Sequence, residues 1–219
     1  MKPHDPSRRR LFKAAGATGL AVAVPLPAPA QAPTPTYAFF NAREAAFIEA
    51  AVARLIPKDE LGPGALEAGV PQFIDRQLAG AWGAGERLYR SGPWRQGTPS
   101  QGYQLPFTPA ELFRNALRGI DPGFAKMPPE KQDEYLKTLE KEKRDLGGVP
   151  SDAFFEALLE ATVEGFFADP VYGGNHDMAG WKLIGFPGAY ANYYELVDRH
   201  NVRFSAPPMS LGAHPMGTK

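Results

Sequence analysis

The histidines and carboxylates of this chain are the residues whose types could bind a metal. Beyond the first 32 residues the histidines are His176, His200 and His214. None belongs to a His-x-x-x-His or Glu-x-x-His pair, the spacings that place two ligands on one helix face. His176 and Asp177 could supply two ligands, but adjacent residues among glycines are more typical of a plain turn. The pattern therefore favours a turn over a metal site.

The sequence gives as little support for acid–base or nucleophilic catalysis as it gives for a metal site. Glu156, Glu160 and Glu164 recur every four residues, and paired carboxylates can transfer protons, but this spacing is more typical of one exposed helix face. No serine lies in a Gly-x-Ser-x-Gly motif or has a histidine at a suggestive spacing. The short glycine motifs at 62–64 and 173–174 complete no nucleotide-binding fingerprint. We predict no catalytic residue in this chain.

Composition excludes several further classes. The chain of 219 residues has no cysteine, which excludes disulfides, thiolate nucleophiles, thioether attachment of haem and iron–sulfur ligation by this chain. The first 32 residues hold five of the 24 basic residues and one of the 24 acidic residues, so the remainder is mildly acidic. It offers no basic stripe to nucleic acid. We expect neither cofactor, metal nor nucleic acid on residues 33–219.

The first 32 residues predict an export signal. Basic residues up to Lys13 precede an apolar run of small residues from Ala14 to Val24, and residues 30–32 form an A-x-A cleavage site. The run is about half as long as a membrane span, which favours cleavage over an uncleaved anchor. Residues 7–13, SRRRLFK, resemble the twin-arginine signal with Leu and Phe exchanged; an ordinary secretory signal is the alternative. The resemblance implies that Arg8 and Arg9 route an already folded protein, usually one with a cofactor, to the periplasm.

Residues 33–219 are predicted to form one all-α domain. Asn41 with Glu44, and Thr108 with Glu111, have the spacing of capping boxes and precede apolar residues at helical spacing. Ser151 is the expected cap of a strongly apolar helix that forms the centre of the core. No segment alternates long enough to be a strand. The predicted helices cover residues 42–55, 71–82, 109–120, 130–144, 152–167 and 190–199.

Long irregular segments separate these helices. Residues 86–108 combine Tyr89, Trp94, Tyr103 and Phe107 with glycines and prolines, and such a loop normally lies against its own domain or a partner. Residues 204–219 contain three prolines and no periodicity. The predicted architecture is a single irregular helical domain with long loops and an extended C-terminal tail.

Residues 169–188, DPVYGGNHDMAGWKLIGFPG, are the densest group of turn-forming and aromatic residues. Gly173, Gly174 and Asn175 tolerate positive φ and allow a neighbouring backbone to approach closely. A rigid loop would then display Tyr172, Trp181 and Phe186, and Tyr and Trp are frequent interface anchors. We expect this loop, with Trp94 and Tyr103, to bind a partner protein. The alternatives are a loop that seals its own core and a ligand site.

Two blocks resemble the small subunit (subunit 3, or gamma) of gluconate 2-dehydrogenase. They are residues 55–70, LIPKDELGPGALEAGV, with FID at 73–75, and residues 169–188; the resemblance spans about residues 40–200. It implies a non-catalytic subunit beside a large flavoprotein of the glucose-methanol-choline class, which holds FAD. It also implies a c-type cytochrome subunit whose haem passes electrons towards membrane quinone.

The resemblance also accounts for the export signal. The large subunit of such complexes often lacks its own signal, so this chain would support export, folding and stability of a periplasmic, inner-membrane-associated sugar or sugar-acid dehydrogenase. The alternatives are an export chaperone that later dissociates, and a stand-alone periplasmic enzyme that uses His176 and Asp177. Residues 86–107 and the tail depart from the family, which leaves the substrate open among gluconate, other sugar acids, sugars and polyols.

Overall fold

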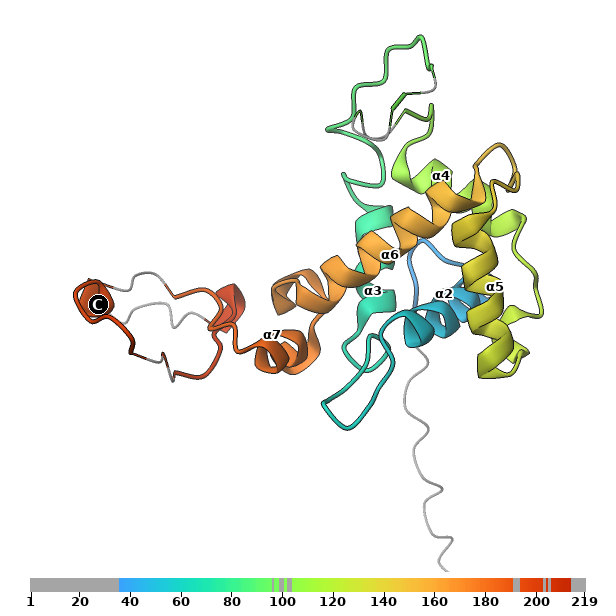
Figure 1. The fold of residues 1–219 in the computed structure, drawn as a ribbon. Coiled ribbons are helices and arrows are strands. Elements are labelled where there is room, and N and C mark those ends of the chain that lie inside the picture. Colours follow the sequence, from blue (N-terminus) through green and yellow to red (C-terminus); the bar gives the residue numbers. More distant parts are fainter. Residues whose placement is uncertain are drawn as a thin grey trace, which may run out of the picture. The chain divides into compact units, whose positions relative to one another are not determined.

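The computed structural model describes residues 36–95, 97–98, 101, 104–190, 194–202, 204 and 206–213, all within the compact unit Pro35–Lys219. The predicted export signal with Arg8 and Arg9, and also Tyr103 and His214, lie outside these residues. The described chain is helical and has no strand, which confirms the predicted all-α class (Figure 1). Its α-helices are α2 (Ala42–Leu55), α3 (Val70–Ala79), α4 (Pro109–Arg118), α5 (Pro129–Lys141), α6 (Ser151–Phe167) and α7 (Ala179–Ile184).

Two of the helices start where their caps predict. The side chain of Asn41 accepts the N–H of Glu44 at 3.0 Å, and Glu44 in turn accepts the N–H of Asn41 at 2.9 Å. Thr108 and Glu111 form the same reciprocal pair at the start of α4. Each capping box satisfies two backbone donors that the first helical turn leaves without partners.

Other boundaries differ from the prediction. Helix α3 ends at Ala79 because Gly80 is extended, so Trp82 lies outside the helix and is exposed. Ser151 is not a cap: its hydroxyl donates to the carbonyl of Glu142 and accepts the N–H of Arg144, and α6 begins at Ser151 itself. These bonds end α5 at Lys141 rather than at 144. The helix predicted over 190–199 is reduced, among the described residues, to a 3-10 turn at Tyr194–Leu196.

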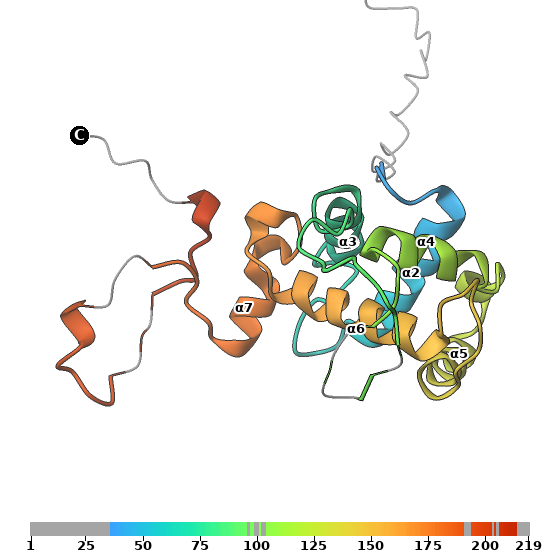
Figure 2. The ribbon, with the colours of Figure 1, turned by 90° about the horizontal axis from the view of Figure 1, so that it is seen from above.

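Helix α6 is the centre of the core, as predicted. It packs against α2, α3, α4, α5 and α7, and lies among them in both views of the ribbon (Figures 1 and 2). Phe154 is fully buried and meets the ring of Phe113 edge to face, with 5.4 Å between ring centroids. Among the described residues no helix is long and apolar enough to cross a membrane.

The segment before α2 is fastened to the core by Asp75 of α3. The buried carboxylate of Asp75 accepts the N–H groups of Ala38, Phe39 and Phe40 at 2.7, 2.8 and 2.9 Å. Arg114 of α4 donates to the carbonyl of Phe39 at 2.7 Å, and its guanidinium lies 4.0 Å from the centre of the Phe39 ring. The residues before α2 are therefore part of the domain.

We predict that Asp75→Ala destabilises the domain by about 3 kcal/mol, because three N–H groups lose one charged acceptor. Asp75→Asn retains one acceptor oxygen and should therefore lower the free energy of unfolding by less than Asp75→Ala does. Urea unfolding of residues 33–219 measures both, with Asp198→Ala as control because Asp198 is exposed. An Asp75→Ala loss below about 1 kcal/mol would show that the segment is held by other contacts.

Candidate functional site

The structure brings together the two sequence blocks that carry the resemblance. The backbone N–H of His176 donates to the carbonyl of Ala68 at 2.9 Å. Gly69 has a φ of +76°, and the His176 ring lies so close that a Cβ on Gly69 would come within 2.2 Å of it. A residue other than glycine is thus excluded at 69 both by its backbone angle and by the imidazole. His176 therefore joins the two blocks through its backbone and its ring.

A groove of about 430 Å³ runs between these blocks. His176 and Asp177 are exposed at its edge, and Glu67 and Lys182 add one charge of each sign. Among the described residues no group of three or more His, Asp or Glu side chains could hold a metal ion. The groove mixes apolar and charged side chains. Its lining residues are Leu61, Gly62, Pro63, Glu67, His176, Asp177, Ala179, Lys182 and Leu183.

The glycine turn has the backbone that its sequence predicts. Gly173 has a φ of +96° and Asn175 a φ of +48°. Gly174 does not take a positive φ; instead it lies against α6, where a Cβ would come within 2.3 Å of the carbonyl oxygen of Gly165. The glycines therefore allow the close backbone approach that the sequence predicts, and the neighbouring backbone belongs to this chain.

Asn175 ties the end of α6 to the start of α7. Its side chain is fully buried, donates to the carbonyl of Ala168 at 2.8 Å and accepts the N–H of Gly180 at 2.8 Å. A Cβ on Gly180 would come within 2.3 Å of the carbonyl oxygen of Phe166, so α7 packs directly on α6. Asn175 suits this position because it tolerates the left-handed conformation and offers both a donor and an acceptor.

Trp181 is buried within the chain and only 5% exposed. Its indole N–H donates to the carbonyl of Phe167 at 2.7 Å and so gives a hydrogen-bond partner to a backbone carbonyl in the last turn of α6. Its ring meets the ring of Phe186 edge to face, with 5.2 Å between ring centroids. This is the arrangement of the alternative in which the loop seals its own core. Contact of Trp181 with a partner stays a prediction.

The neighbours of Trp181 face solvent. Tyr172 is 54% exposed and Phe186 is 45% exposed, and both lie on a backbone that is held by the bonds of Asn175 and Trp181. Three further apolar side chains of the same segment, Val171, Leu183 and Ile184, are also exposed. Leu183 and Ile184 belong to α7, whose six residues are too few for helical periodicity to be recognised from the sequence.

Asp169 connects this segment to the C-terminal tail. Its carboxylate accepts the N–H of Val171 at 3.0 Å, the hydroxyl of Ser210 at 2.6 Å and the N–H of Leu211 at 2.8 Å. Burial alone would raise the pKa of Asp169, but these hydrogen bonds outweigh it and hold the pKa below its ordinary value. The tail around Ser210 and Leu211 is thus held against the start of the segment 169–188.

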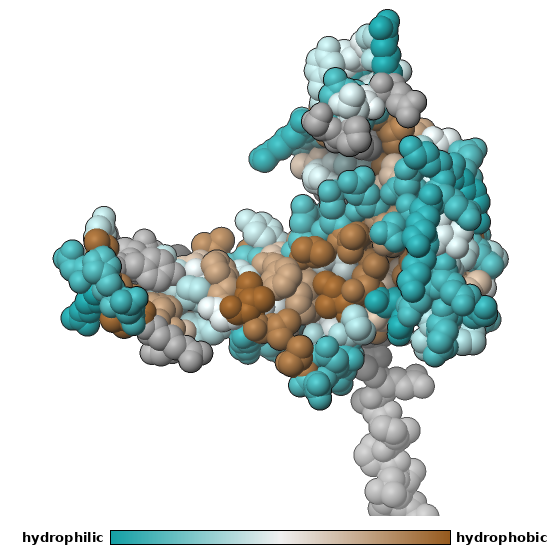
Figure 3. Space-filling model, viewed as in Figure 1, coloured by the Kyte–Doolittle hydropathy of each residue, from teal (hydrophilic) through white to brown (hydrophobic). Residues whose placement is uncertain are grey.

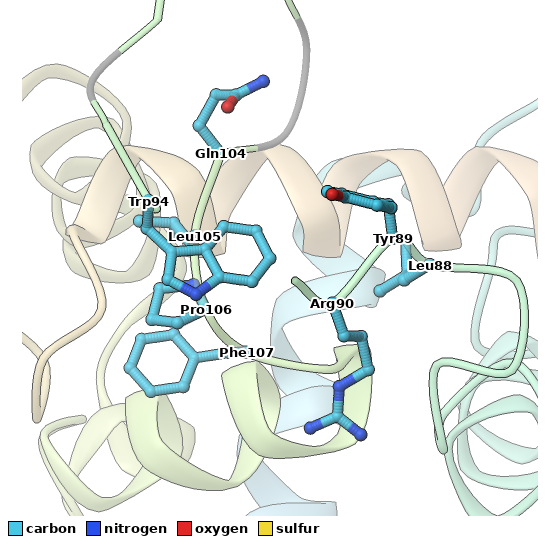
Figure 4. A pocket seen from close by; sticks show the side chains of 8 residues that line it. All are labelled: Leu88, Tyr89, Arg90, Trp94, Gln104, Leu105, Pro106 and Phe107. Atoms are coloured by element: carbon cyan, nitrogen blue, oxygen red, sulfur yellow. The ribbon is translucent and has the colours of Figure 1, made fainter. Parts of the chain in front are cut away.

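Trp94 belongs to a different surface (Figure 4). A small cavity of about 180 Å³ separates Trp94, Leu105, Pro106 and Phe107 on one side from Leu88 and Tyr89 on the other. Arg90 also lines the cavity, and its guanidinium lies 3.7 Å from the carboxylate of Glu111 of α4. This loop lies at the α4 end of the domain, whereas α7 lies at the opposite end of α6 (Figures 1 and 2). The structure does not bring Trp94 together with residues 169–188.

We predict that Trp181→Ala destabilises the isolated domain by about 3 kcal/mol or more, because a large buried side chain and its hydrogen bond are lost. Trp181→Phe should destabilise the domain by less, since the aromatic packing remains. Tyr172→Ala is the control and should leave the melting temperature nearly unchanged because Tyr172 is exposed. Thermal unfolding followed by circular dichroism measures all three; equal melting of Trp181→Ala and the unmodified domain would contradict the prediction.

Comparison with known proteins agrees with the resemblance. A family model described as gluconate 2-dehydrogenase subunit 3 matches residues 42–188, which include all six α-helices of the described chain. Neither a curated protein nor a solved structure matches significantly. Because the family model covers more than half of the chain, the chain belongs to the gluconate 2-dehydrogenase subunit 3 family.

Proposed function

We propose that this chain is the non-catalytic small subunit of a periplasmic, inner-membrane-associated dehydrogenase that oxidises a sugar or a sugar acid. The family is that of a subunit of gluconate 2-dehydrogenase, an oxidoreductase complex. In the proposal a large subunit of the glucose-methanol-choline class carries FAD, and a cytochrome subunit carries haem c. The small subunit supports the export, folding and stability of the flavoprotein.

The observation that carries this proposal is the set of exposed apolar side chains on the rigid segment 169–188. Tyr172 and Phe186 face solvent while Asn175 and Trp181 hold the backbone beneath them. A pre-ordered segment binds a partner without a large loss of conformational entropy. Exposed apolar groups that are gathered in one place are typical of a protein–protein interface.

The cofactors of the complex belong, in this proposal, to its other subunits. The absence of cysteine excludes thioether attachment of haem c to this chain, so a cytochrome subunit must hold it. The isolated chain should then be colourless, and all flavin should travel with the large subunit. A chaperone that dissociates after export is the second candidate, and stoichiometric co-purification of the exported chain with active enzyme separates the two.

The resemblance of residues 7–13 to the twin-arginine signal predicts that Arg8→Lys with Arg9→Lys keeps both this chain and the flavoprotein in the cytoplasm. Dehydrogenase activity and immunoblots of the periplasmic fraction measure the effect, and both should fall to background. Arg10→Lys is the matched control because Arg10 occupies the variable position of the motif. Normal periplasmic activity of the double variant would exclude this route.

Tyr172→Ala should weaken association with the flavoprotein by about 2 kcal/mol, the scale of an interface hot spot. The melting temperature of the isolated chain should stay unchanged, since Tyr172 is exposed. Titration calorimetry with the purified large subunit measures the affinity. Tyr194→Ala is the control, because Tyr194 is also exposed but belongs to another turn. Equal affinity of Tyr172→Ala and the unmodified chain would remove Tyr172 from the interface.

A further inference from the structure

Helix α6 is apolar on its outer side as well as on the side that faces the core. Phe154, Leu158 and Phe166 fill the core. A second set of apolar residues follows at four-residue spacing along the other side of the same helix. We call this set the outer row; it consists of Phe155, Leu159, Val163 and Phe167.

The outer row is open to solvent at its centre. Leu159 is 38% exposed and Val163 is 42% exposed, while Phe155 and Phe167 are half-buried at its two ends. In the space-filling view, apolar surface covers the region of α6 and continues over α7 (Figure 3). Exposed apolar side chains gathered along one face of a helix are typical of a surface that a partner covers, so the outer row is suited to being covered.

An acidic row borders the outer row. Glu156, Glu160 and Glu164 are exposed and stand three residues before Leu159, Val163 and Phe167, so the two rows are neighbours on the helix surface. Among the described residues no lysine or arginine forms an ion pair with these carboxylates. Partial burial, together with the neighbouring charge of Glu160, raises the pKa of Glu164.

We propose that the outer row and the acidic row form a docking surface for the flavoprotein subunit, which covers the row with apolar side chains and places lysines or arginines against the carboxylates. This inference rests on the proposed function and adds a second contact region to the segment 169–188. The outer row is about 18 Å long, the length of roughly three helical turns, which fits one amphipathic helix of the partner.

The charges argue against two other occupants. A second copy of this chain packed symmetrically through α6 would bring its own acidic row to the interface and add like charges. Residues 1–32 of this chain are basic and apolar, but in the proposed export route they are removed, so they would leave the row uncovered in the exported complex. A partner whose apolar face is bordered by basic residues would cover the outer row and pair with the carboxylates of the acidic row.

Site-specific photo-crosslinking in the co-expressed complex tests the surface directly. A benzoylphenylalanine at position 159 or 163 should cross-link to the flavoprotein. The same probe at Glu140, an exposed position of α5, should not. Cross-links from 159 and 163 to a second copy of this chain or to its own residues 1–32 would overturn the proposal, as would their absence in a complex that has formed.

Charge reversal tests the electrostatic half of the proposal. Glu160→Lys and Glu164→Lys should each weaken binding to the purified flavoprotein at least tenfold at low salt, whereas the matched variant Glu140→Lys should bind like the unmodified chain. Thermal unfolding of each isolated variant confirms that it folds. Unchanged or tighter binding of the two α6 variants would contradict a basic edge on the partner.

The controls separate this inference from the proposed function. Failure of the unmodified chain to bind the flavoprotein would overturn both. If the unmodified chain binds and Tyr172→Ala weakens it, but the α6 variants bind normally, only the docking surface on α6 is wrong.

Discussion

The packing of the other helices around α6 is the constraint on which this structure depends. Helices α2, α3, α4 and α5 meet α6 on its core side, and α7 closes its C-terminal end. That end is sealed by backbone contact, because Gly174 and Gly180 leave no side chain between the two segments. The carbonyl of Phe167 then receives the indole N–H of Trp181 rather than water. One helix thus organises both the core and the segment that displays the candidate interface.

The sequence was sufficient where the deciding interaction is local. Asn41 and Thr108 mark helix starts because their caps reach only three residues along the chain. The cap predicted at Ser151 is wrong because the partners of its hydroxyl, Glu142 and Arg144, lie in the preceding turn rather than in α6. Helix α7 is too short for its periodicity to predict it. Whether the side chain of Trp181 is buried or exposed depends on which part of α6 the other helices leave uncovered. This is a property of the tertiary structure, and the spacing of residues in the sequence does not predict it.

The motifs that carry the resemblance also have identifiable structural roles. Gly69 makes room for the ring of His176, so residues more than a hundred positions apart in the sequence are fitted to each other. Asp75, at the end of the first block, holds the segment before α2. The two blocks therefore build part of the scaffold of this chain. The groove and the exposed side chains of Tyr172 and Phe186 lie on the outside of this scaffold.

The late position of α6 in the chain has a consequence for biosynthesis. Ile48 and Val52 of α2 are fully buried in the finished domain, yet the helix that completes their core starts at Ser151. At roughly 5–20 residues per second, the ribosome makes α6 on the order of ten seconds after α2. During that interval α3 and α5, which also pack on α2, can cover part of its apolar face, but the core remains incomplete. The core of the domain can therefore be completed only after α6 has been synthesised.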